Sequence, residues 1–221
     1  MSVLYVIATP IGNLEDVTLR ALNNLKEVDL IVCEDTRHTL KLLNHFGIKK
    51  PLISCHQHSK IQKIEQIINT IKKGKKVALV SNAGTPGISD PGQILIKKAY
   101  EAKIKVIPIP GTSALTTALS VSGFPADEFV FYGFLPHKKG RQTKLKELKD
   151  EGKTTVIYES PYRIKKLLKG LLEMGVDREI MIGRELTKKF EEIYRGRISE
   201  ILPTIKEKGE FVVVLEGKRD E

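Results

Sequence analysis

The feature that most constrains the fold is a regular alternation of short apolar runs and helical patterns over residues 1–110. Five apolar runs are predicted strands: Val3–Ala8, Asp29–Cys33, Pro51–Ser54, Lys76–Val80 and Lys105–Pro108. Four segments between them have helical spacing: Thr18–Val28, Thr39–Phe46, Ile61–Lys73 and Gln93–Ala102. Strands that alternate with helices favour a parallel sheet covered on both faces. Ligands on such sheets bind beyond the carboxyl ends of the strands.

The pattern changes between residues 111 and 125. Further strands are predicted at Phe129–Phe134, Thr154–Tyr158, Glu179–Ile182, Glu192–Arg197 and Phe211–Glu216. Helices are predicted at Thr112–Val121, Gly140–Glu151, Arg163–Met174 and Glu200–Glu207. The strands are more closely spaced here, which favours hairpins and a mixed sheet. We therefore predict an α/β chain with a parallel-sheet N-terminal domain, residues 1–112, and a mixed-sheet C-terminal domain, residues 113–221.

Charge and cysteine content narrow the class of protein. Lys and Arg number 37 against 27 Asp and Glu, so the net charge is +10. A basic surface favours polyanions such as RNA, although a general enrichment in lysine gives the same total. Two cysteines are too few for a disulfide framework or a multi-cysteine zinc site. The sequence has no long apolar span and no signal peptide, so we expect a cytoplasmic protein. We also expect a protein that needs no metal.

Polar loops follow the predicted strands of the first half. Ala8-Thr9-Pro10-Ile11-Gly12-Asn13-Leu14-Glu15-Asp16 follows the first strand. Gly12 and Asn13 tolerate unusual backbone angles, but a plain turn explains them equally well. Neither the dinucleotide fingerprint nor the phosphate-binding P-loop is present in the sequence, which argues against NAD and ATP.

Glu34-Asp35-Thr36-Arg37-His38 follows the second strand. Two carboxylates beside an arginine can position a hydroxyl group or accept its proton. The alternative is an ordinary helix start, with Asp35 or Thr36 as the cap and the basic side chains in solvent.

Two further loops of the first half are rich in glycine and proline. Ser81-Asn82-Ala83-Gly84-Thr85-Pro86-Gly87-Ile88-Ser89-Asp90-Pro91-Gly92 follows one strand, and Pro108-Ile109-Pro110-Gly111-Thr112-Ser113-Ala114 ends the next. Such loops let the backbone approach a ligand closely, although surface loops have the same composition.

The second half contributes two strand-end motifs and a basic segment. The motifs are Tyr158-Glu159-Ser160-Pro161-Tyr162-Arg163 and Gly183-Arg184-Glu185-Leu186-Thr187-Lys188-Lys189. The basic segment supplies candidate RNA-binding residues: Lys138, Lys139, Arg141 and Lys144. Such a segment is either a phosphate-contacting surface or a solvated helix face.

Taken in order, the motifs ATPIGNLED, EDTRHT, SNAGTPGISDPG, PGTSA, YESPYR and RELTK closely resemble the ribosomal RNA small-subunit methyltransferase family of the tetrapyrrole (corrin/porphyrin) methylase superfamily. The resemblance extends from Val3 to Gly217. It implies two α/β domains with S-adenosylmethionine (SAM) in a cleft between them. It also implies a homodimer that methylates the ribose 2′-oxygen of a cytidine in the decoding region of 16S rRNA.

The resemblance also assigns the cofactor-binding residues. They are Pro10, Gly12, Gly84, Thr85, Ile88, Thr112, Ser113, Ala114, Tyr158, Arg184, Glu185 and Leu186. Many relatives have Gly-Asp-Pro where this chain has Gly84-Thr85-Pro86, so a charged contact from that aspartate is not expected here.

The expected chemistry needs little beyond positioning, because SAM already carries an activated methyl group. The candidate catalytic residues are Glu34, Asp35, Arg37 and Glu159. We expect one of the carboxylates to assist deprotonation and Arg37 to hold a phosphate or ribose. Two alternatives stay open: a methyltransferase of a small tetrapyrrole-like substrate and a non-catalytic RNA-binding protein.

Overall fold

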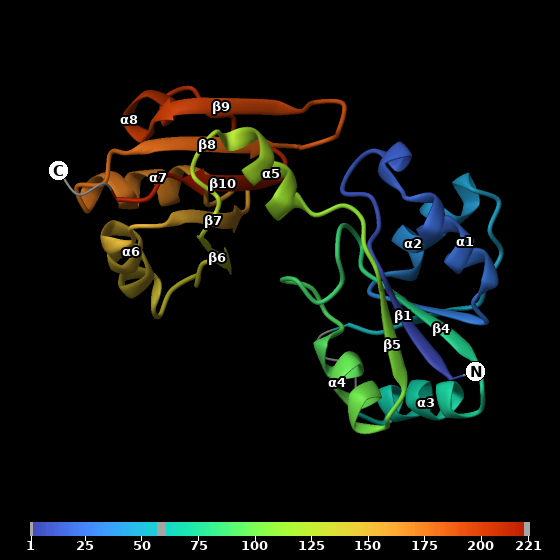
Figure 1. Ribbon diagram of the computed structural model, residues 1–221. Coiled ribbons are helices and arrows are strands. Elements are labelled where there is room, and N and C mark those ends of the chain that lie inside the picture. The colour runs from blue at the N-terminus through green and yellow to red at the C-terminus, as the bar shows by residue number, and fades with distance from the viewer. Residues whose placement is uncertain (1, 57–60, 219–221) are drawn as a thin grey trace. The chain divides into compact units, whose positions relative to one another are not determined.

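The computed structural model describes residues 2–56 and 61–218 of the chain. It divides into two compact units, Met1–Ser113 and Ala114–Glu221 (Figure 1). The division lies next to the boundary expected after residue 112. Each unit has its own sheet and its own hydrophobic core, so each is described by itself.

The first unit has a five-stranded sheet. Its strands are β1 (Val3–Ile7), β2 (Leu30–Cys33), β3 (Leu52–Ser54), β4 (Lys76–Val80) and β5 (Lys105–Ile109), in the order β3-β2-β4-β1-β5. Every pairing is parallel, and Val3 lies opposite both Lys76 and Lys105. The predicted parallel sheet is therefore confirmed. All five carboxyl ends lie at one edge of the sheet.

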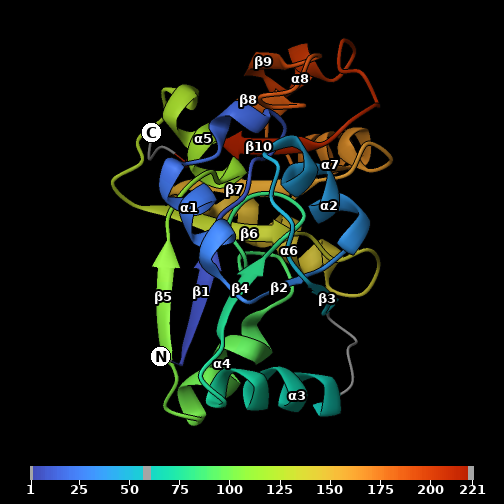
Figure 2. The same cartoon turned by 90° about the vertical axis from the view of Figure 1, so that its right-hand side faces the viewer.

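Helices cover both faces of this sheet because successive strand residues point to opposite sides. The helices are α1 (Leu19–Glu27), α2 (Thr36–His45), α3 (Ile61–Lys72) and α4 (Gln93–Glu101), and a short 3₁₀ turn, η1 (Leu14–Asp16), precedes α1. Val77 and Leu79 pack with α3 and α4 on one face, and these helices lie side by side in Figures 1 and 2. Ala78 and Val80 pack with α1 and α2 on the other face.

The start of α2 shows how a local cap sets the geometry of a loop. Asp35 Oδ1 accepts a hydrogen bond from the Arg37 N–H at 2.9 Å, which satisfies an otherwise unpaired helix donor. The helix consequently begins at Thr36 rather than at Thr39, where the sequence pattern placed it. This cap holds the polar residues after β2 close to the edge of the sheet.

The second unit contains a mixed sheet. Its strands are β6 (Phe129–Phe134), β7 (Thr154–Glu159), β8 (Glu179–Arg184), β9 (Glu192–Arg197) and β10 (Phe211–Leu215), in the order β6-β7-β10-β8-β9. Strands β6 and β7 are parallel, and the other neighbours are antiparallel. The predicted mixed sheet is confirmed.

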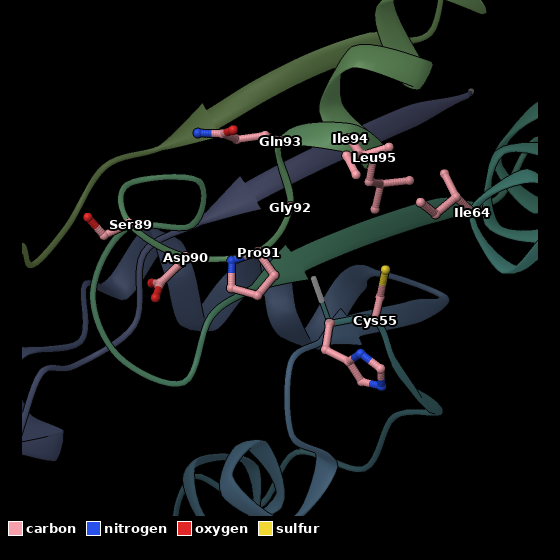
Figure 3. Close-up of a pocket in the computed structure, with 10 residues that line it drawn as sticks. Cys55, Ile64, Ser89, Asp90, Pro91, Gly92, Gln93, Ile94 and Leu95 are labelled. Carbon is pink, nitrogen blue, oxygen red and sulfur yellow. The ribbon is translucent and has the colours of Figure 1, made fainter. Parts of the chain in front are cut away.

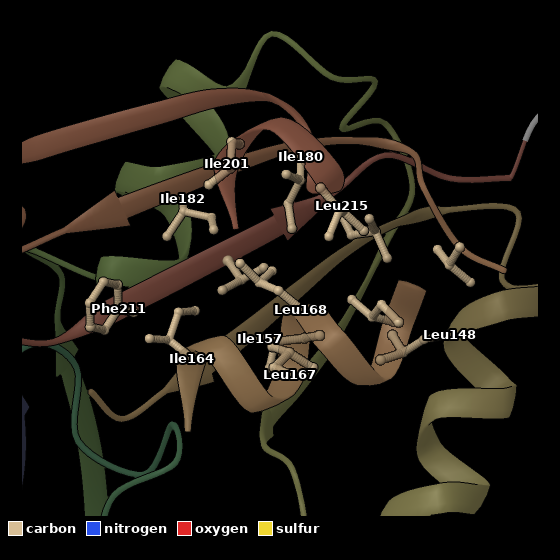
Figure 4. Close-up of a cluster of buried hydrophobic side chains, with 14 of the residues drawn as sticks. Leu148, Ile157, Ile164, Leu167, Leu168, Ile180, Ile182, Ile201, Phe211 and Leu215 are labelled. Carbon is tan, nitrogen blue, oxygen red and sulfur yellow. The ribbon is translucent and has the colours of Figure 1, made fainter. Parts of the chain in front are cut away.

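One face of the mixed sheet is buried under α6 (Arg141–Asp150), α7 (Ile164–Glu173) and α8 (Ile198–Ile201). Figure 4 shows this core, in which Leu167 and Leu168 of α7 meet Ile157, Ile180 and Leu215 of the strands. The other face is covered by α5 (Ala114–Ser122), which contacts β8 and β10. Burial on both faces explains why β10 is apolar at every position.

The predicted helix at Glu200–Glu207 is wrong. The structure has a single turn, α8, that begins earlier, where Asp177 Oδ1 accepts a hydrogen bond from the Ser199 N–H at 2.9 Å. Pro203 lacks an N–H group and cannot continue the helical ladder, so the regular turn ends before it. Among residues 2–56 and 61–218, no helix is long and apolar enough to cross a membrane.

Candidate active site

Three loops at the carboxyl edge of the parallel sheet are joined by hydrogen bonds. Thr9 and Gly84 exchange backbone N–H···O bonds of 2.9 and 2.8 Å, which connects the loops after β1 and β4. The Thr112 hydroxyl donates to the Thr9 carbonyl, and the Thr85 hydroxyl donates to the Thr112 carbonyl at 3.0 Å. We call Thr9, Gly84, Thr85 and Thr112 the rim. The rim holds the loops after β1, β4 and β5 in one arrangement.

Two glycines let the backbone of these loops pack closely together. Gly84 has a φ of 77°, which side chains with a Cβ rarely adopt. A Cβ on Gly111 would lie only 3.0 Å from the Cβ of Ala8, so the loop after β5 passes directly against the loop after β1. The rim is therefore built from closely packed backbone and hydroxyl groups and not from charged side chains.

The remaining residues expected to bind cofactor in the first unit lie around the rim. Pro10 is buried, Gly12 is exposed, and Ser113 is half-buried. Ile88 is 43% exposed, which leaves an apolar side chain available for contact. Ala114 is the first residue of α5 and belongs to the second unit.

A second set of polar side chains lies beside the rim, at the ends of β2 and β4. Asn82 Nδ2 donates to Glu34 Oε2 at 2.7 Å, while Asn82 Oδ1 is buried and has no hydrogen-bond partner within the described part of the chain. Burial raises the pKa of Asp90 to about 6, a hydrogen bond with Ser81 opposes the rise, and the charge of Glu34 adds to it. We call Glu34, Ser81, Asn82 and Asp90 the carboxylate cluster.

Asp35 and Arg37 form an ion pair at the start of α2. Arg37 Nε and Nη2 donate to the two oxygens of Asp35 at 3.1 and 2.7 Å. These hydrogen bonds hold the pKa of Asp35 at about 2. Asp35 is therefore a poor proton acceptor near neutral pH, whereas the Arg37 side chain is 88% exposed and accessible to an anion.

Glu159 is held inside the second unit. Its side chain is fully buried, Arg163 Nη2 lies 2.8 Å from one oxygen, and Arg141 Nη1 lies 3.8 Å from the other. The backbone N–H of Ser160 also donates to Glu159 at 2.8 Å. This arrangement favours a structural role, because a buried carboxylate with two arginine partners is not accessible to a large substrate.

The basic segment contains both accessible lysines and a buried arginine. Lys138 and Lys139 are exposed, and Lys144 is half-buried, over the ring of Tyr132 and 2.5 Å from Glu147. Arg141 is only 6% exposed because its guanidinium turns towards Glu159. The geometry supports a surface role for the lysines and not for Arg141.

The other expected residues of the second unit are well anchored. The Tyr158 hydroxyl accepts a hydrogen bond from the Leu115 N–H at 3.1 Å, and its ring meets Phe131 edge-on at 4.9 Å. Arg184 donates to the carbonyl oxygens of Lys208 and Phe190 and to Glu192.

Glu185 and Leu186 continue from the end of β8. Glu185 has a φ of 51°, and Leu186 is buried against Gly183. The SAM-binding role of the residues of the second unit stays a prediction.

Nowhere in residues 2–56 and 61–218 do three or more His, Cys, Asp or Glu side chains gather in a way that could hold a metal ion.

Comparison with known proteins places the chain in a family. The family model of the Tetrapyrrole (Corrin/Porphyrin) Methylases matches residues 3–202. The chain belongs to this family of methyltransferases, and the resemblance seen in its motifs is confirmed.

Similar proteins extend over the whole chain. A protein of Thermotoga maritima named ribosomal RNA small subunit methyltransferase I is 49% identical over 221 residues, which are 99% of this chain and 100% of that protein. A protein of the same name from Bacillus subtilis is 47% identical over 100% of this chain and 77% of its own length. The corresponding Escherichia coli O157:H7 protein is 46% identical over 98% of this chain and 78% of its own length.

Two solved structures share the fold at low sequence identity. The uroporphyrin-III-C-methyltransferase of Thermus thermophilus has a TM-score of 0.66 and 19% identity, over 97% of this chain and 94% of that chain. A cobalt precorrin-4 methyltransferase of cobalamin biosynthesis has a TM-score of 0.74 and 15% identity, over 97% and 95%. At these identities the likeness concerns the fold alone.

Sequence reasoning missed Asp90 as a functional candidate. The residue stands in the glycine- and proline-rich loop after β4, which the sequence singles out, but nothing in the local pattern separates it from a solvated turn residue. Its raised pKa depends on burial and on Glu34, which follows a different strand. Only the neighbouring positions of β2 and β4 in the sheet bring these groups together.

Proposed function

We propose that this chain transfers a methyl group from SAM to the ribose 2′-oxygen of a cytidine in the decoding region of 16S rRNA. The observation that carries the proposal is the 45–49% identity, over essentially the whole chain, with proteins named ribosomal RNA small subunit methyltransferase I. The net charge of +10 agrees with a polyanionic substrate.

The rim supports SAM as the methyl donor. It is built from hydroxyls, carbonyl oxygens and closely approaching backbone instead of a cluster of cations. Such groups suit a neutral nucleoside with an amino-acid tail better than a triphosphate. The buried Oδ1 of Asn82, which has no hydrogen-bond partner among the described residues, can accept a further hydrogen bond from a ligand. SAM, when bound, supplies a methyl group on a positively charged sulfur.

The protein's own residues then hold the acceptor in line with that methyl group. Holding the two reactants in the correct relative position is the largest single contribution to the rate expected here, because the methyl group needs no further activation. Exposed Arg37, fixed by Asp35, would contact a phosphate with its planar guanidinium. Lys138, Lys139 and Lys144 would add phosphate contacts. We also propose a cytoplasmic homodimer that needs no metal ion.

A small tetrapyrrole-like substrate is the second candidate. It is favoured only by the fold, which solved tetrapyrrole methyltransferases share at 19% and 15% identity. The much higher identity to the proteins named for ribosomal RNA outweighs that likeness.

The test is methyl transfer by the purified full chain from labelled SAM. Small ribosomal subunits, protein-free 16S rRNA and a uroporphyrinogen are offered separately. We expect label in the RNA, and alkaline hydrolysis should leave one labelled dinucleotide intact, since a methylated 2′-oxygen cannot attack the neighbouring phosphate. Label in the uroporphyrinogen alone would support the second candidate. Label in an alkali-sensitive RNA product would place the methyl group on a base and contradict the ribose assignment.

A further inference from the structure

The second unit carries two exposed aromatic side chains that the proposed function does not use. Phe134, the last residue of β6, is 55% exposed, and Tyr162, in the turn after β7, is 92% exposed. The pocket of about 360 Å³ shown in Figure 3 is lined by residues of the first unit, Asp90 among them, and belongs to the candidate active site. Large rings left in water forgo the free energy of burial, so a pair of them at one end of a sheet indicates a surface that a partner covers.

The backbones that carry these two rings are side by side. Strands β6 and β7 are parallel, and Phe134 lies opposite Tyr158, so both strands end at the same edge of the sheet. Tyr162 follows in the turn after β7. Arg163 Nη1 donates to the Leu135 carbonyl at 3.0 Å, which joins the residue after Tyr162 to the residue after Phe134. We call Phe134 and Tyr162 the aromatic pair.

The ring of Phe134 is supported from inside the unit. The ring of Tyr158 meets it edge-on, with the ring centroids 5.7 Å apart. Tyr158 is itself fixed, because its hydroxyl accepts a hydrogen bond from the Leu115 N–H at 3.1 Å. A ring that is held in this way and still exposed loses little conformational freedom when a partner covers it.

The turn that carries Tyr162 is fixed on both sides of the residue. Pro161 precedes it and restricts the backbone through its ring. Arg163 follows it, and its Nη2 lies 2.8 Å from the buried carboxylate of Glu159, while its N–H donates to the Ser160 carbonyl at 3.0 Å. The buried ion pair therefore holds an exposed aromatic side chain at the tip of an ordered turn.

The charge beside the aromatic pair identifies the chemistry of the partner. The loop that begins directly after Phe134 exposes His137, Lys138 and Lys139, and no Asp or Glu stands between Phe134 and Arg141. Lysines attract phosphates, and aromatic faces stack on nucleobases. Bases inside a duplex are already stacked on one another, whereas an unpaired strand offers its bases to such rings.

We propose that the aromatic pair stacks on unpaired bases of the RNA while Lys138 and Lys139 contact the neighbouring phosphates. The proposal rests on the proposed function, since it states how the same RNA substrate is recognised. Phosphate contacts alone carry little information about the bases. The aromatic pair gives the basic segment a preference for unpaired strands over duplex RNA.

The first test compares the affinities of the full chain for three probes. They are a short unstructured RNA strand, the same strand paired with its complement, and a ribose–phosphate chain of equal length without bases. The variants are Phe134→Ala and Tyr162→Ala. Phe129→Ala is the matched control, because it removes the same kind of side chain at the opposite end of β6, where Phe129 is 39% exposed.

We expect the wild type to prefer the unpaired strand. Phe134→Ala and Tyr162→Ala should each lower the affinity for that strand by about 5- to 150-fold, the loss of one stacked base. Their affinities for the duplex and for the base-free chain should be those of the wild type, because the lysines are unchanged. Phe129→Ala should match the wild type on all three probes.

The second test reports the stacking contact directly. The chain has no tryptophan, so Phe134→Trp introduces a single indole and keeps a flat aromatic face. This variant should bind the unpaired strand about as well as the wild type, and its fluorescence should fall on binding because a stacked base quenches the indole. The base-free chain should cause no such fall. Phe129→Trp should show no quenching with either probe.

Three results would overturn the proposal. The first is wild-type affinity for the unpaired strand in both alanine variants. The second is an equal loss of affinity for the base-free chain, which would mean that the rings support the basic loop and do not contact bases. The third is a weaker association between copies of the chain in sedimentation of the alanine variants, together with an unquenched Phe134→Trp, which would assign the aromatic pair to an interface between copies.

The proposed function is tested separately, by methyl transfer from the wild-type chain to RNA. Any of the three results above leaves that function intact if the wild type methylates RNA. A wild type that methylates no RNA would overturn the proposed function, whereas base-dependent quenching of Phe134→Trp would still support the stacking contact.

Discussion

Asn82 and Glu34 join the ends of two neighbouring strands, since Asn82 Nδ2 donates to Glu34 Oε2 at 2.7 Å. Asn82→Ala removes this bond and frees Glu34 to turn. We expect methyl transfer to slow by up to about 10²-fold because orientation is lost, and SAM affinity to fall only by the contribution of the Asn82 Oδ1, since the rim is kept. Single-turnover rates and calorimetry measure the two effects. Asn69→Ala, at an exposed position of α3, should change neither, and an equal slowing there would refute the assignment.

Gly84→Ala should abolish SAM binding, whereas Gly74→Ala should not. Both glycines have positive φ values, 77° and 90°, so both substitutions strain the backbone by about 1–2 kcal/mol. Gly74 has open space around it, while Gly84 belongs to the rim. Calorimetry measures the affinity, and thermal unfolding confirms that the two variants are equally destabilised. Equal SAM affinity in both would show that the rim does not contact the donor.

Removing the charges of Lys138, Lys139 and Lys144 together should weaken RNA binding and reduce its dependence on salt. Each lost phosphate contact should reduce the slope of log affinity against log salt by roughly 0.7–0.9. Arg141 stays in place, because it is buried against Glu159. RNA affinity is measured over a salt series. The control is the double variant Lys72→Ala and Lys73→Ala, which removes two exposed lysines at the end of α3. If the salt slope falls equally in the control, the basic segment has no special role in RNA binding.

Glu159→Gln should destabilise the second unit by about 3–5 kcal/mol, because Arg141 and Arg163 would be left buried without a balancing charge. Urea unfolding of the full chain measures the change. Glu147→Gln removes an exposed partner of Lys144 and should cost at most about 1 kcal/mol. A stable Glu159→Gln variant that no longer transfers methyl groups would instead restore Glu159 as a catalytic candidate.

Asp90 should make the protein less stable as the pH rises from about 3.8 to about 6. The pKa of Asp90 in the folded state is higher than the ordinary value, so over this range the folded state keeps the proton while the unfolded state releases it. The stabilisation that comes from this tighter proton binding is therefore lost as the pH rises. Asp90→Asn should therefore be more stable than the wild type at neutral pH, by about 1–2 kcal/mol for a carboxyl that is still partly in contact with water. Denaturation curves at pH values on both sides of this range test the sign. A variant that is less stable than the wild type at neutral pH would contradict it.

The sequence predicted the strand ends of the first unit well, because the alternation of apolar runs and helical stripes is a local pattern. The loops after β1, β2, β4 and β5 were all identified, and they share one edge because the sheet is parallel. The rim itself was not predicted. Its hydrogen bonds join Thr9, Gly84 and Thr112, which are far apart in the chain.

The environments of the Arg141 and Asp90 side chains could not be predicted from the local sequence pattern. Arg141 stands among lysines and has the sequence context of a solvated cation, but its burial depends on Glu159 at the end of β7. Asp90 has the context of a turn residue, but burial in the folded unit raises its pKa, and the charge of Glu34 at the end of β2 adds to the rise. In both cases the environment of the side chain comes from burial and from a partner distant in the sequence, and both exist only in the folded unit.

The placement of every loop of the first unit's site at the carboxyl edge of one sheet has a consequence for how such enzymes diversify. The core that holds the strands lies on the two faces of the sheet and does not share residues with the rim. Loops can therefore be exchanged without repacking the interior, and a new specificity requires changes in only a few exposed turns. This separation explains how methyltransferases with tetrapyrrole substrates share the fold at 15–19% identity. Laboratory redesign of the acceptor should accordingly begin with the turns after β2 and β4 and leave the hydrophobic layers untouched.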